Sequence, residues 1–391
     1  MAGYIMNLDS LKSLKNYISD GIYSTKMSPP SNNNWKPHHE ATFADYTTMK
    51  PGDNIYFFIK RKIYGIGELV SINGDCKFLN YPGANKPQLY AYEDVENILL
   101  WNEGEYSVDQ RWICAFKPNP YFFKKGVDMD EALSYNPSKF RSLRAFWKVS
   151  FIKIDDEENQ ALKDVLLKNN QDVLKNPQKD KICQSNYKNY HHKIREKVKE
   201  NRAYQFEIKD ILSNCADGPQ LRHEMALEAG ILFQLSNNHK STTDVFGSWD
   251  YLSHQVIASP FKPINYMDKM DIFGYSFIGG YKPTKSKFLV LELKKDHANE
   301  QDVDQLLKYV DWVKDEYSHG DYSMIDSYLV AFDFSEDVVK YAQEIGIRKY
   351  TIGRRPPKSK EWSNLKLVKY YFDKHDYSIK FSRVARFGSL N

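Results

Sequence analysis

The sequence lacks the features that mark membrane proteins and disulfide-stabilised secreted proteins. Its apolar runs are far too short to cross a bilayer, so we expect no transmembrane helix. The first 14 residues have no basic region followed by an apolar stretch, so we expect no signal peptide. The four cysteines lie far apart without a CxxC spacing, which predicts neither a zinc site nor a disulfide framework. We therefore expect a cytoplasmic protein with no membrane partner.

A strong excess of one charge is also absent. The chain has 55 Lys and Arg against 51 Asp and Glu, a net charge of +4, so any surface for nucleic acid has to be local. Residues 161–203 hold such an excess, with eleven basic and five acidic residues. With Tyr187 and Tyr190 interleaved, this segment suits salt-sensitive contacts with phosphates. It suits a solvated, Lys-rich linker helix equally well.

The length of 391 residues predicts two domains joined by a connector. Short strand-like segments dominate the first part of the chain, whereas strands and helices alternate in the last part. We expect a two-domain fold of the α+β or α/β class. Its parts are a barrel-like β domain over 1–160, a basic helical linker over 161–204, and a mixed sheet flanked by helices over 205–391.

A candidate catalytic site centres on residues 287–295, KFLVLELKK. Four apolar residues followed by alternation predict a buried strand, with Glu292 and Lys294 on one face. Asp271 lies 21 positions before Glu292, near the end of another strand-like segment. Two carboxylates at neighbouring strand ends can hold Mg²⁺ (or Mn²⁺), and a lysine beside them can position the attacking water. Such residues at strand ends are also common in proteins without this chemistry.

Two helical segments add candidate residues. Gln305 and Tyr309 are four positions apart, on one face of a predicted helix with an apolar stripe. A second helix is predicted to begin near residues 217–219 and carries Glu224 and Glu228 at the same spacing. Either carboxylate suits an additional ligand role or simple exposure on the helix surface.

The order Asp271, Glu292-x-Lys294, Gln305-x-x-x-Tyr309 resembles the motifs of the PD-(D/E)XK nuclease superfamily. The resemblance runs from Lys269 to about Arg354 and is greatest to the RecB-like catalytic domains of mismatch-type endonucleases. It implies that Asp271 and Glu292 bind metal, that Lys294 assists the attacking water, and that Gln305 orients water or phosphate. It also implies an acidic ligand on the first core helix, assigned to Glu224 with Glu228 as the alternative.

Three segments near the N-terminus, 49–53 (MKPGD), 65–72 (GIGELVSI) and 140–162, resemble the PUA-like superfamily, especially EVE and YTH-like domains. Such domains hold a flipped, often modified base between aromatic rings, and stacking contributes about 1–3 kcal/mol per base. The aromatic and polar candidates for this pocket are Trp35, Trp101, Trp112, Tyr23 and Ser24, with Thr25 beside them. Buried packing is the alternative role for each tryptophan.

The remaining segments carry structural expectations. Residues 244–255 are expected to form a loop, and the tail from residue 365 is expected to form a basic, aromatic β-hairpin. Arg354 and Arg355 are candidates for phosphate contact.

The two resemblances together imply a metal-dependent DNA endonuclease that reads a modified base and restricts foreign DNA, in the manner of type IV restriction. One alternative is an endonuclease that repairs mismatched or branched DNA. Another is a DNA-binding protein on a nuclease fold that does not cleave. Cutting both strands with one site per chain would need two protomers, which makes a homodimer a further hypothesis.

Overall fold

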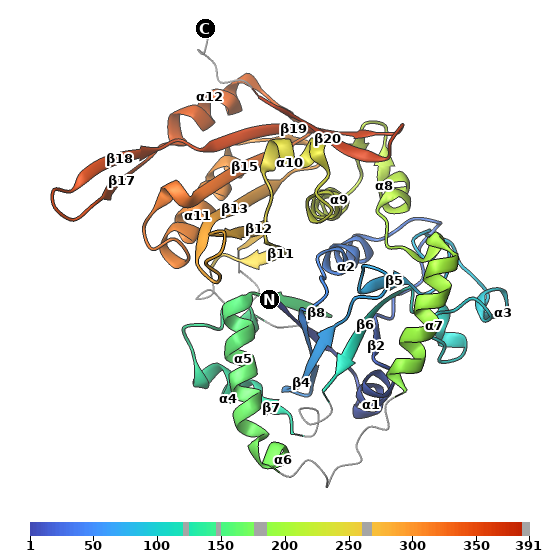
Figure 1. The fold of residues 1–391 in the computed structure, drawn as a ribbon. Helices are drawn as coiled ribbons and strands as arrows, with labels where there is room; N and C mark the ends of the chain where they lie inside the picture. Colours follow the sequence, from blue (N-terminus) through green and yellow to red (C-terminus); the bar gives the residue numbers. More distant parts are fainter. Residues whose placement is uncertain (120–124, 146–149, 176–185, 260–267, 385–391) are drawn as a thin grey trace. The chain divides into compact units, whose positions relative to one another are not determined.

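A computed structural model describes residues 1–119, 125–145, 150–175, 186–259 and 268–384. The chain divides into two compact units (Figure 1). Unit 1 comprises Met1–Asn34 and Asp45–Glu207, and unit 2 comprises Trp35–Ala44 and Ile208–Asn391. Within the described residues, no helix combines the length and apolar character needed to cross a membrane.

Unit 1 is built on one mixed β-sheet with strand order β2-β6-β4-β3-β1-β8, to which β5 and β7 add short pairings. Only β1 and β3 run parallel within this order. The strands are β1 (Gly3–Asn7), β2 (Ile22–Ser24), β3 (Asn54–Ile59), β4 (Lys62–Leu69), β5 (Lys77–Leu79), β6 (Trp112–Pro118), β7 (Val127–Asp128) and β8 (Phe151–Ile154). The helices are α1 (Leu11–Asp20), α3 (Tyr92–Val95), α4 (Met129–Tyr135), α5 (Asp156–Asn169), α6 (Gln171–Lys175) and α7 (Tyr187–Glu200).

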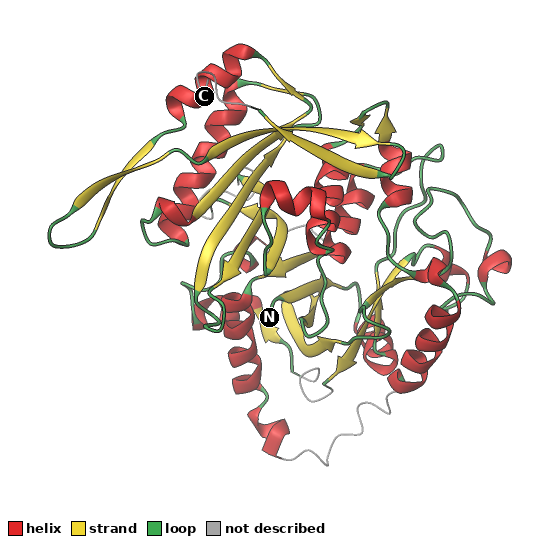
Figure 2. Ribbon diagram, turned by 45° about the horizontal axis from the view of Figure 1, so that its top comes forward, coloured by secondary structure: helices red, strands yellow, loops and turns green. Residues whose placement is uncertain are grey.

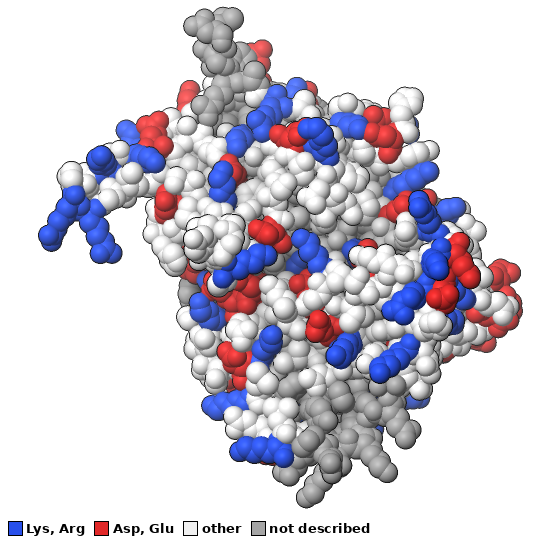
Figure 3. All heavy atoms as spheres, viewed as in Figure 1, with Lys and Arg blue, Asp and Glu red and all other residues white. Residues whose placement is uncertain are grey.

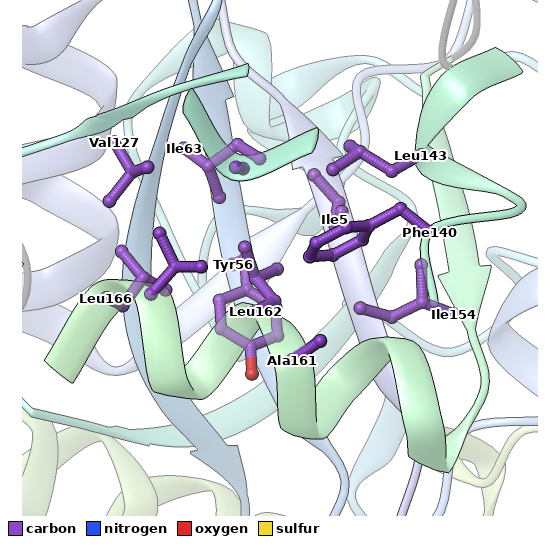
Figure 4. Packing of buried hydrophobic residues seen from close by; sticks show 12 residues of the cluster. Ile5, Tyr56, Ile63, Val127, Phe140, Leu143, Ile154, Ala161, Leu162 and Leu166 are labelled. Atoms are coloured by element: carbon purple, nitrogen blue, oxygen red, sulfur yellow. The ribbon is translucent and has the colours of Figure 1, made fainter. Parts of the chain in front are cut away.

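Helix α5 covers part of this sheet and closes a hydrophobic core (Figure 4). Leu162, Val165 and Leu166 recur at helical spacing and pack on buried side chains from β1, β3, β4 and β8. The buried Tyr56 hydroxyl donates to Asn159 Oδ1 at 2.6 Å, which ties the helix to β3. Helix α7 packs on α1 through His191, whose Nε2 lies 2.9 Å from Gly21 O. The contacts of both helices therefore place most of the described part of 161–204 within unit 1.

Helix α2 (Pro37–Thr47) spans the division between the units, which falls after Ala44. Its first half packs in unit 2, where the Phe43 and Phe233 rings lie 6.2 Å apart. The Trp35 amide donates to Asn214 Oδ1 at 3.1 Å. A short segment from the first fifty residues is thus part of the core of unit 2.

Unit 2 contains a six-stranded mixed sheet with order β11-β12-β13-β15-β19-β20 (Figure 2). Strands β13, β15 and β19 run parallel, and the other neighbours are antiparallel. The main strands are β11 (Tyr251–Ile257), β12 (Lys269–Phe277), β13 (Lys285–Leu293), β15 (Ile325–Ala331), β19 (Leu365–Asp373) and β20 (Ser378–Arg383). Short pairs join β9 (Ala216–Asp217) to β10 (Gln220–Leu221), β14 (His297–Ala298) to β16 (Asp333–Phe334), and β17 (Arg348–Ile352) to β18 (Lys358–Trp362).

The described part of unit 2 also contains the helices α8 (Lys209–Cys215), α9 (Glu224–Ser236), α10 (Lys240–Phe246), α11 (Glu300–Glu316) and α12 (Glu336–Ile345). Helix α9 packs on β11, β12, β13 and β20, and α11 packs on β13 and β15. Phe288 to Leu291 are all buried, as expected for a strand covered on both faces. Two units of mixed α and β structure agree with the coarse fold class expected from the sequence.

Two local expectations are wrong. The helix expected near residues 217–219 begins at Glu224, because residues 216–221 form a tight hairpin in which Gly218 has φ +63°. The segment expected as a loop over 244–255 instead contains the end of α10 and most of β11. The expected tail hairpin is confirmed and continues the main sheet through β19 and β20.

Candidate active site

The candidate site lies on a row of side chains that crosses three neighbouring strands. Ile272 pairs with Leu291, so the antiparallel register places Asp271 opposite Glu292. His254 pairs with Ile272, and the same reasoning places Gln255 opposite Asp271. Directly opposed residues share one face of a sheet. Sheet pairing therefore brings Asp271 and Glu292 together across β12 and β13.

Gln255 joins this row to helix α9. Its Nε2 donates to Asp271 Oδ1 at 3.2 Å and to Glu228 Oε2 at 3.0 Å. The other Glu228 oxygen forms a short hydrogen bond with His254 Nδ1. Gln255 has a positive φ of 50°, a backbone conformation that is unfavourable for a residue with a side chain. The hydrogen-bonded carboxylates offset this cost by holding the amide between them.

Lys294 pairs with Glu292 at the other end of the row. Its ammonium donates to Glu292 Oε1 at 2.7 Å and lies 3.6 Å from Asp302 Oδ1 on helix α11. Asp271, the carboxylate on the neighbouring strand β12, is also held by a hydrogen bond, because the Leu293 amide donates to its Oδ2 at 2.8 Å. The lysine and the two carboxylates therefore occupy fixed positions at the end of β13.

Burial and crowding of like charges perturb these groups. Burial, followed by the charges of Glu292 and Glu228, raises the pKa of Asp271 well above its ordinary value. Burial raises the pKa of Glu292 to about 7, against the opposing effect of Lys294. Burial acts to lower the pKa of Lys294, but nearby carboxylates, Glu292 foremost, outweigh it and the pKa is raised. The site thus contains more carboxyl groups than its one lysine could balance if all of them were ionised.

A divalent cation fits this arrangement on chemical grounds. Glu292 is 1% exposed, and its Oε2 has no hydrogen-bond partner among the described residues. An orphaned buried carboxylate oxygen beside a second carboxylate is the oxygen-rich environment that Mg²⁺ or Mn²⁺ prefers. Asp271 and Glu292 are the side chains that would hold the ion, and Glu228 is a further carboxylate that is linked to Asp271 through their shared partner Gln255.

Helix α11 contributes the predicted Gln305 and Tyr309 pair. Gln305 Nε2 donates to the Tyr309 hydroxyl at 2.6 Å, and the tyrosine is buried. Burial is the main cause of the raised pKa of Tyr309, and the charges of Glu292 and Asp271 add to it. The pair therefore lies within electrostatic range of both strand carboxylates.

The two acidic candidates on α9 occupy different environments. Glu228 is 1% exposed and bonded to His254 and Gln255, whereas Glu224 is exposed at the first position of the helix. Glu224 still lies close enough to raise the pKa of Glu292. The geometry favours Glu228 as the carboxylate that shares hydrogen bonds with the row.

Sequence reasoning missed Gln255, and it offered His254 only as a candidate for phosphate contact, not as a partner of Glu228. Their segment YLSHQVI has strand-like residues at both ends, which could have indicated a strand. No signal along the chain could show that its polar centre faces Glu228, because that contact depends on how α9 packs on β11.

Unit 1 has a polar hollow of about 400 Å³ near the predicted base-binding residues. Tyr23 and Ser24 both line it, together with Tyr17, Thr25, Lys26, Asp9, Asn7, Leu8, Ser13 and Ser150. The Tyr17 and Tyr23 rings meet edge to face with centroids 5.2 Å apart. Ser24 is 2% exposed, and its Oγ has no hydrogen-bond partner among the described residues. The hollow thus offers aromatic surface and an orphaned hydroxyl.

The three predicted tryptophans do not line this hollow. Trp101 is fully buried behind Tyr17 and donates from Nε1 to Asp20 Oδ2 at 2.9 Å. Trp112 is fully buried and packs edge-on against Phe206. Trp35 belongs to unit 2. All three side chains are buried. A larger hollow of about 490 Å³ between α12 and β19 contains none of the site residues.

Comparison with known proteins returns partial similarities. No protein-family model and no curated protein matches the chain. A crystal structure of a repair endonuclease from Pyrococcus abyssi is similar at 25% identity over 34% of this chain and 47% of that chain, with a TM-score of 0.21. The structure of an EndoMS–dsDNA2 complex is similar at 25% identity over 21% of this chain and 30% of that chain, with a TM-score of 0.16. The chain spans less than half the length of either, so the case for function rests on the side chains.

Proposed function

We propose that the chain is a metal-dependent DNA endonuclease of the PD-(D/E)XK type, with the cleaving site in unit 2. The observation that carries the proposal is the row that joins half-buried Asp271 to buried Glu292, with Lys294 bonded to Glu292. Buried carboxylates that repel one another are costly, and a bound cation relieves that cost. The order of these motif residues along the chain and their meeting on one sheet face both support the same chemistry.

Each residue has a distinct task in this mechanism. Asp271 and Glu292 would hold Mg²⁺ or Mn²⁺, which when bound would lower the pKa of water and offset charge on the phosphate. Lys294 keeps its ammonium charged and positions the attacking water. The water oxygen bonds to phosphorus while one P–O ester bond breaks, which leaves a phosphate on one strand end and a hydroxyl on the other. The pair of Gln305 and Tyr309 orients water or phosphate.

Unit 1 supplies recognition in this proposal, as a PUA- or EVE-like reader of a flipped or modified base. Its hollow lies within the range of about 300–1,000 Å³ typical of small-ligand pockets. Tyr17 and Tyr23 offer faces or edges for a base, and the orphaned Ser24 hydroxyl can bond to a polar base edge. A base-recognition domain joined to a nuclease domain would restrict modified foreign DNA. The repair alternative has the same cutting site and differs in the substrate.

Cleavage of matched DNA substrates tests the proposal. Plasmids that are unmodified, 5-methylated or 5-hydroxymethylated at cytosine, and a mismatched duplex, are incubated with Mg²⁺, Mn²⁺ or EDTA. We expect metal-dependent cleavage of modified DNA that is lost in Asp271→Asn and Lys294→Ala. Lys295→Ala is the matched control, because this neighbouring lysine pairs with Asp296 outside the row.

Each outcome separates the hypotheses. Cleavage confined to the mismatched duplex would favour repair, and equal cleavage of all DNAs would remove the reader. Binding without cleavage in any metal would favour a non-cleaving protein. For the reader, Ser24→Ala should reduce discrimination between modified and unmodified DNA, whereas the exposed Ser138→Ala should not.

A further inference from the structure

A second cluster of metal-binding side chains lies in unit 2, apart from the row on the sheet. Glu40 from the first turn of α2, Cys215 at the end of α8 and His223 just before α9 converge there. Their ligand atoms all lie within 4.8 Å of one another. Among the residues that the structure describes, this is the one group of three or more His, Cys, Asp and Glu that meets that condition.

Glu40 is the centre of the cluster. Its side chain is fully buried, and Oε1 accepts from Cys215 Sγ at 2.8 Å. His223 Nδ1 lies 2.9 Å from Oε1 and 3.1 Å from Oε2. A thiol is a weak donor, so a buried carboxylate that depends on a thiol and one imidazole is poorly compensated. A dication at this point would balance the carboxylate and a thiolate together.

We propose that Glu40, Cys215 and His223 bind a zinc-class transition-metal ion. Zinc accepts carboxylate oxygen, thiolate sulfur and imidazole nitrogen at about 2.0–2.3 Å, so its ligand atoms lie within about 4.5 Å of one another. The thiolate and imidazole select such an ion over Mg²⁺. The His223 side chain is 32% exposed, so solvent reaches the cluster and water completes the coordination.

Binding also changes the protons of the ligands. The Cys215 thiol donates its proton to Glu40, so an incoming ion displaces that proton to solvent. His223 would bind through Nδ1, which gives up the proton it donates to Glu40, and the neutral ring then carries its proton on Nε2.

The ion would join chain segments that are distant in sequence. Glu40 lies 175 positions before Cys215 and 183 positions before His223. One ion therefore fastens the 35–44 segment to unit 2 and fixes the start of α9, the helix that carries Glu228. The proposal does not rest on nuclease activity, because it concerns binding and stability.

Metal analysis of the full chain tests the site. After zinc loading and dialysis, we expect about one zinc per chain, with at least a tenfold loss in Cys215→Ser and His223→Gln. Cys76→Ser is the matched control, since Cys76 is also buried but lies in unit 1. Asp271→Asn should keep its zinc, which separates this site from the row on the sheet.

Cobalt spectroscopy gives a second readout, and its wild-type measurement does not depend on any variant folding. Wild-type protein loaded with Co²⁺ should show a thiolate-to-cobalt charge-transfer band, and Cys76→Ser should keep it. Wild type without stoichiometric zinc and without that band would overturn the proposal. Retention of both zinc and the band in Cys215→Ser would overturn it as well, because another cysteine would then bind the metal.

Discussion

At the scale of single residues, the Glu228–Gln255–Asp271 chain of hydrogen bonds is the least expected feature of the candidate site. A positive φ at a residue other than glycine costs on the order of 1–3 kcal/mol and persists where its surroundings enforce it. Here the enforcing contacts are the two carboxylates that accept from one amide. This arrangement predicts which acidic residue of α9 matters for cleavage.

We predict that Glu228→Gln lowers metal-dependent cleavage about 10- to 100-fold, the usual cost of losing a group that orients metal ligands. Glu224→Gln, on the same helix but exposed, should lower it much less. Cleavage rates over a Mg²⁺ titration check both variants, and Glu228→Gln should need more metal. A larger loss in Glu224→Gln than in Glu228→Gln would assign the role to the helix start instead.

Glu158 in unit 1 predicts a pH-dependent stability. It is 1% exposed, and its Oε1 accepts from the amides of Ser142 and Leu143. Burial, followed by the charge of Asp155, raises the pKa of Glu158 to about 8. The folded state therefore keeps this proton when the unfolded state has lost it. The contribution of Glu158 to the free energy of unfolding is fully present below the unfolded-state pKa near 4.5. It is lost as the pH rises through the folded-state pKa of about 8.

We expect Glu158→Gln to lose less stability than wild type between pH 5 and 9, by on the order of 3 kcal/mol. Urea unfolding at several pH values measures the difference, and subtracting wild type from variant cancels the titration of other groups. Glu131→Gln, an exposed carboxyl on α4, is the control and should follow wild type. If the free energy of unfolding changes equally with pH in wild type and in Glu158→Gln, the prediction is wrong.

At the scale of elements, the β17–β18 hairpin is the clearest basic feature of unit 2. Residues 349–360 contain five Lys and Arg and no Asp or Glu, and Arg354 and Arg355 are exposed. Lys and Arg gather at the tip of this arm, at the left of Figure 3. An exposed pair of strands with a basic tip suits contact with a phosphate backbone.

We predict that reversing the charge of Arg354 and Arg355 to Glu weakens DNA binding and makes it less sensitive to salt. Each lost phosphate contact should reduce the slope of log affinity against log salt by about 0.9. Binding measured at several salt concentrations tests this, with the double Arg→Lys variant as the charge-keeping control. If the slope of log affinity against log salt is unchanged in the Glu variant, the β17–β18 hairpin does not contact DNA.

At the level of the complete chain, the two units share helix α2, so no single position in the sequence separates them. A fragment that begins at Ile208 lacks Trp35–Ala44 and therefore the Phe43 contact and the Glu40 carboxylate. The Cys215 thiol and His223 would lose their shared partner. Unit 2 should depend on a segment from the start of the chain.

We predict faster hydrogen–deuterium exchange at the start of α9 in a 208–391 fragment than in the full chain. A synthetic peptide of residues 33–47 added in trans should restore part of the protection. The sheet strands β13 and β15 serve as the internal reference within the same fragment. Equal protection of α9 without the peptide would show that the segment is dispensable.

Elements with local signals can be predicted from the sequence alone. The apolar run before Glu292, the spacing of Gln305 and Tyr309, and the tail hairpin all correspond to observed elements, because strand alternation and helical periodicity are encoded within a few residues. The helix expected at residues 217–219 fails for a local reason as well, since a glycine at positive φ closes a hairpin there.

The meeting of side chains that are distant in sequence depends on the tertiary fold. Strand register placed Asp271 opposite Glu292, and packing of α9 brought Glu228 to Gln255. Cysteine spacing gives no sign that Cys215 meets Glu40, because the two residues are 175 positions apart in the sequence. Such contacts depend on the summed burial of whole elements, and no short stretch of sequence contains that information.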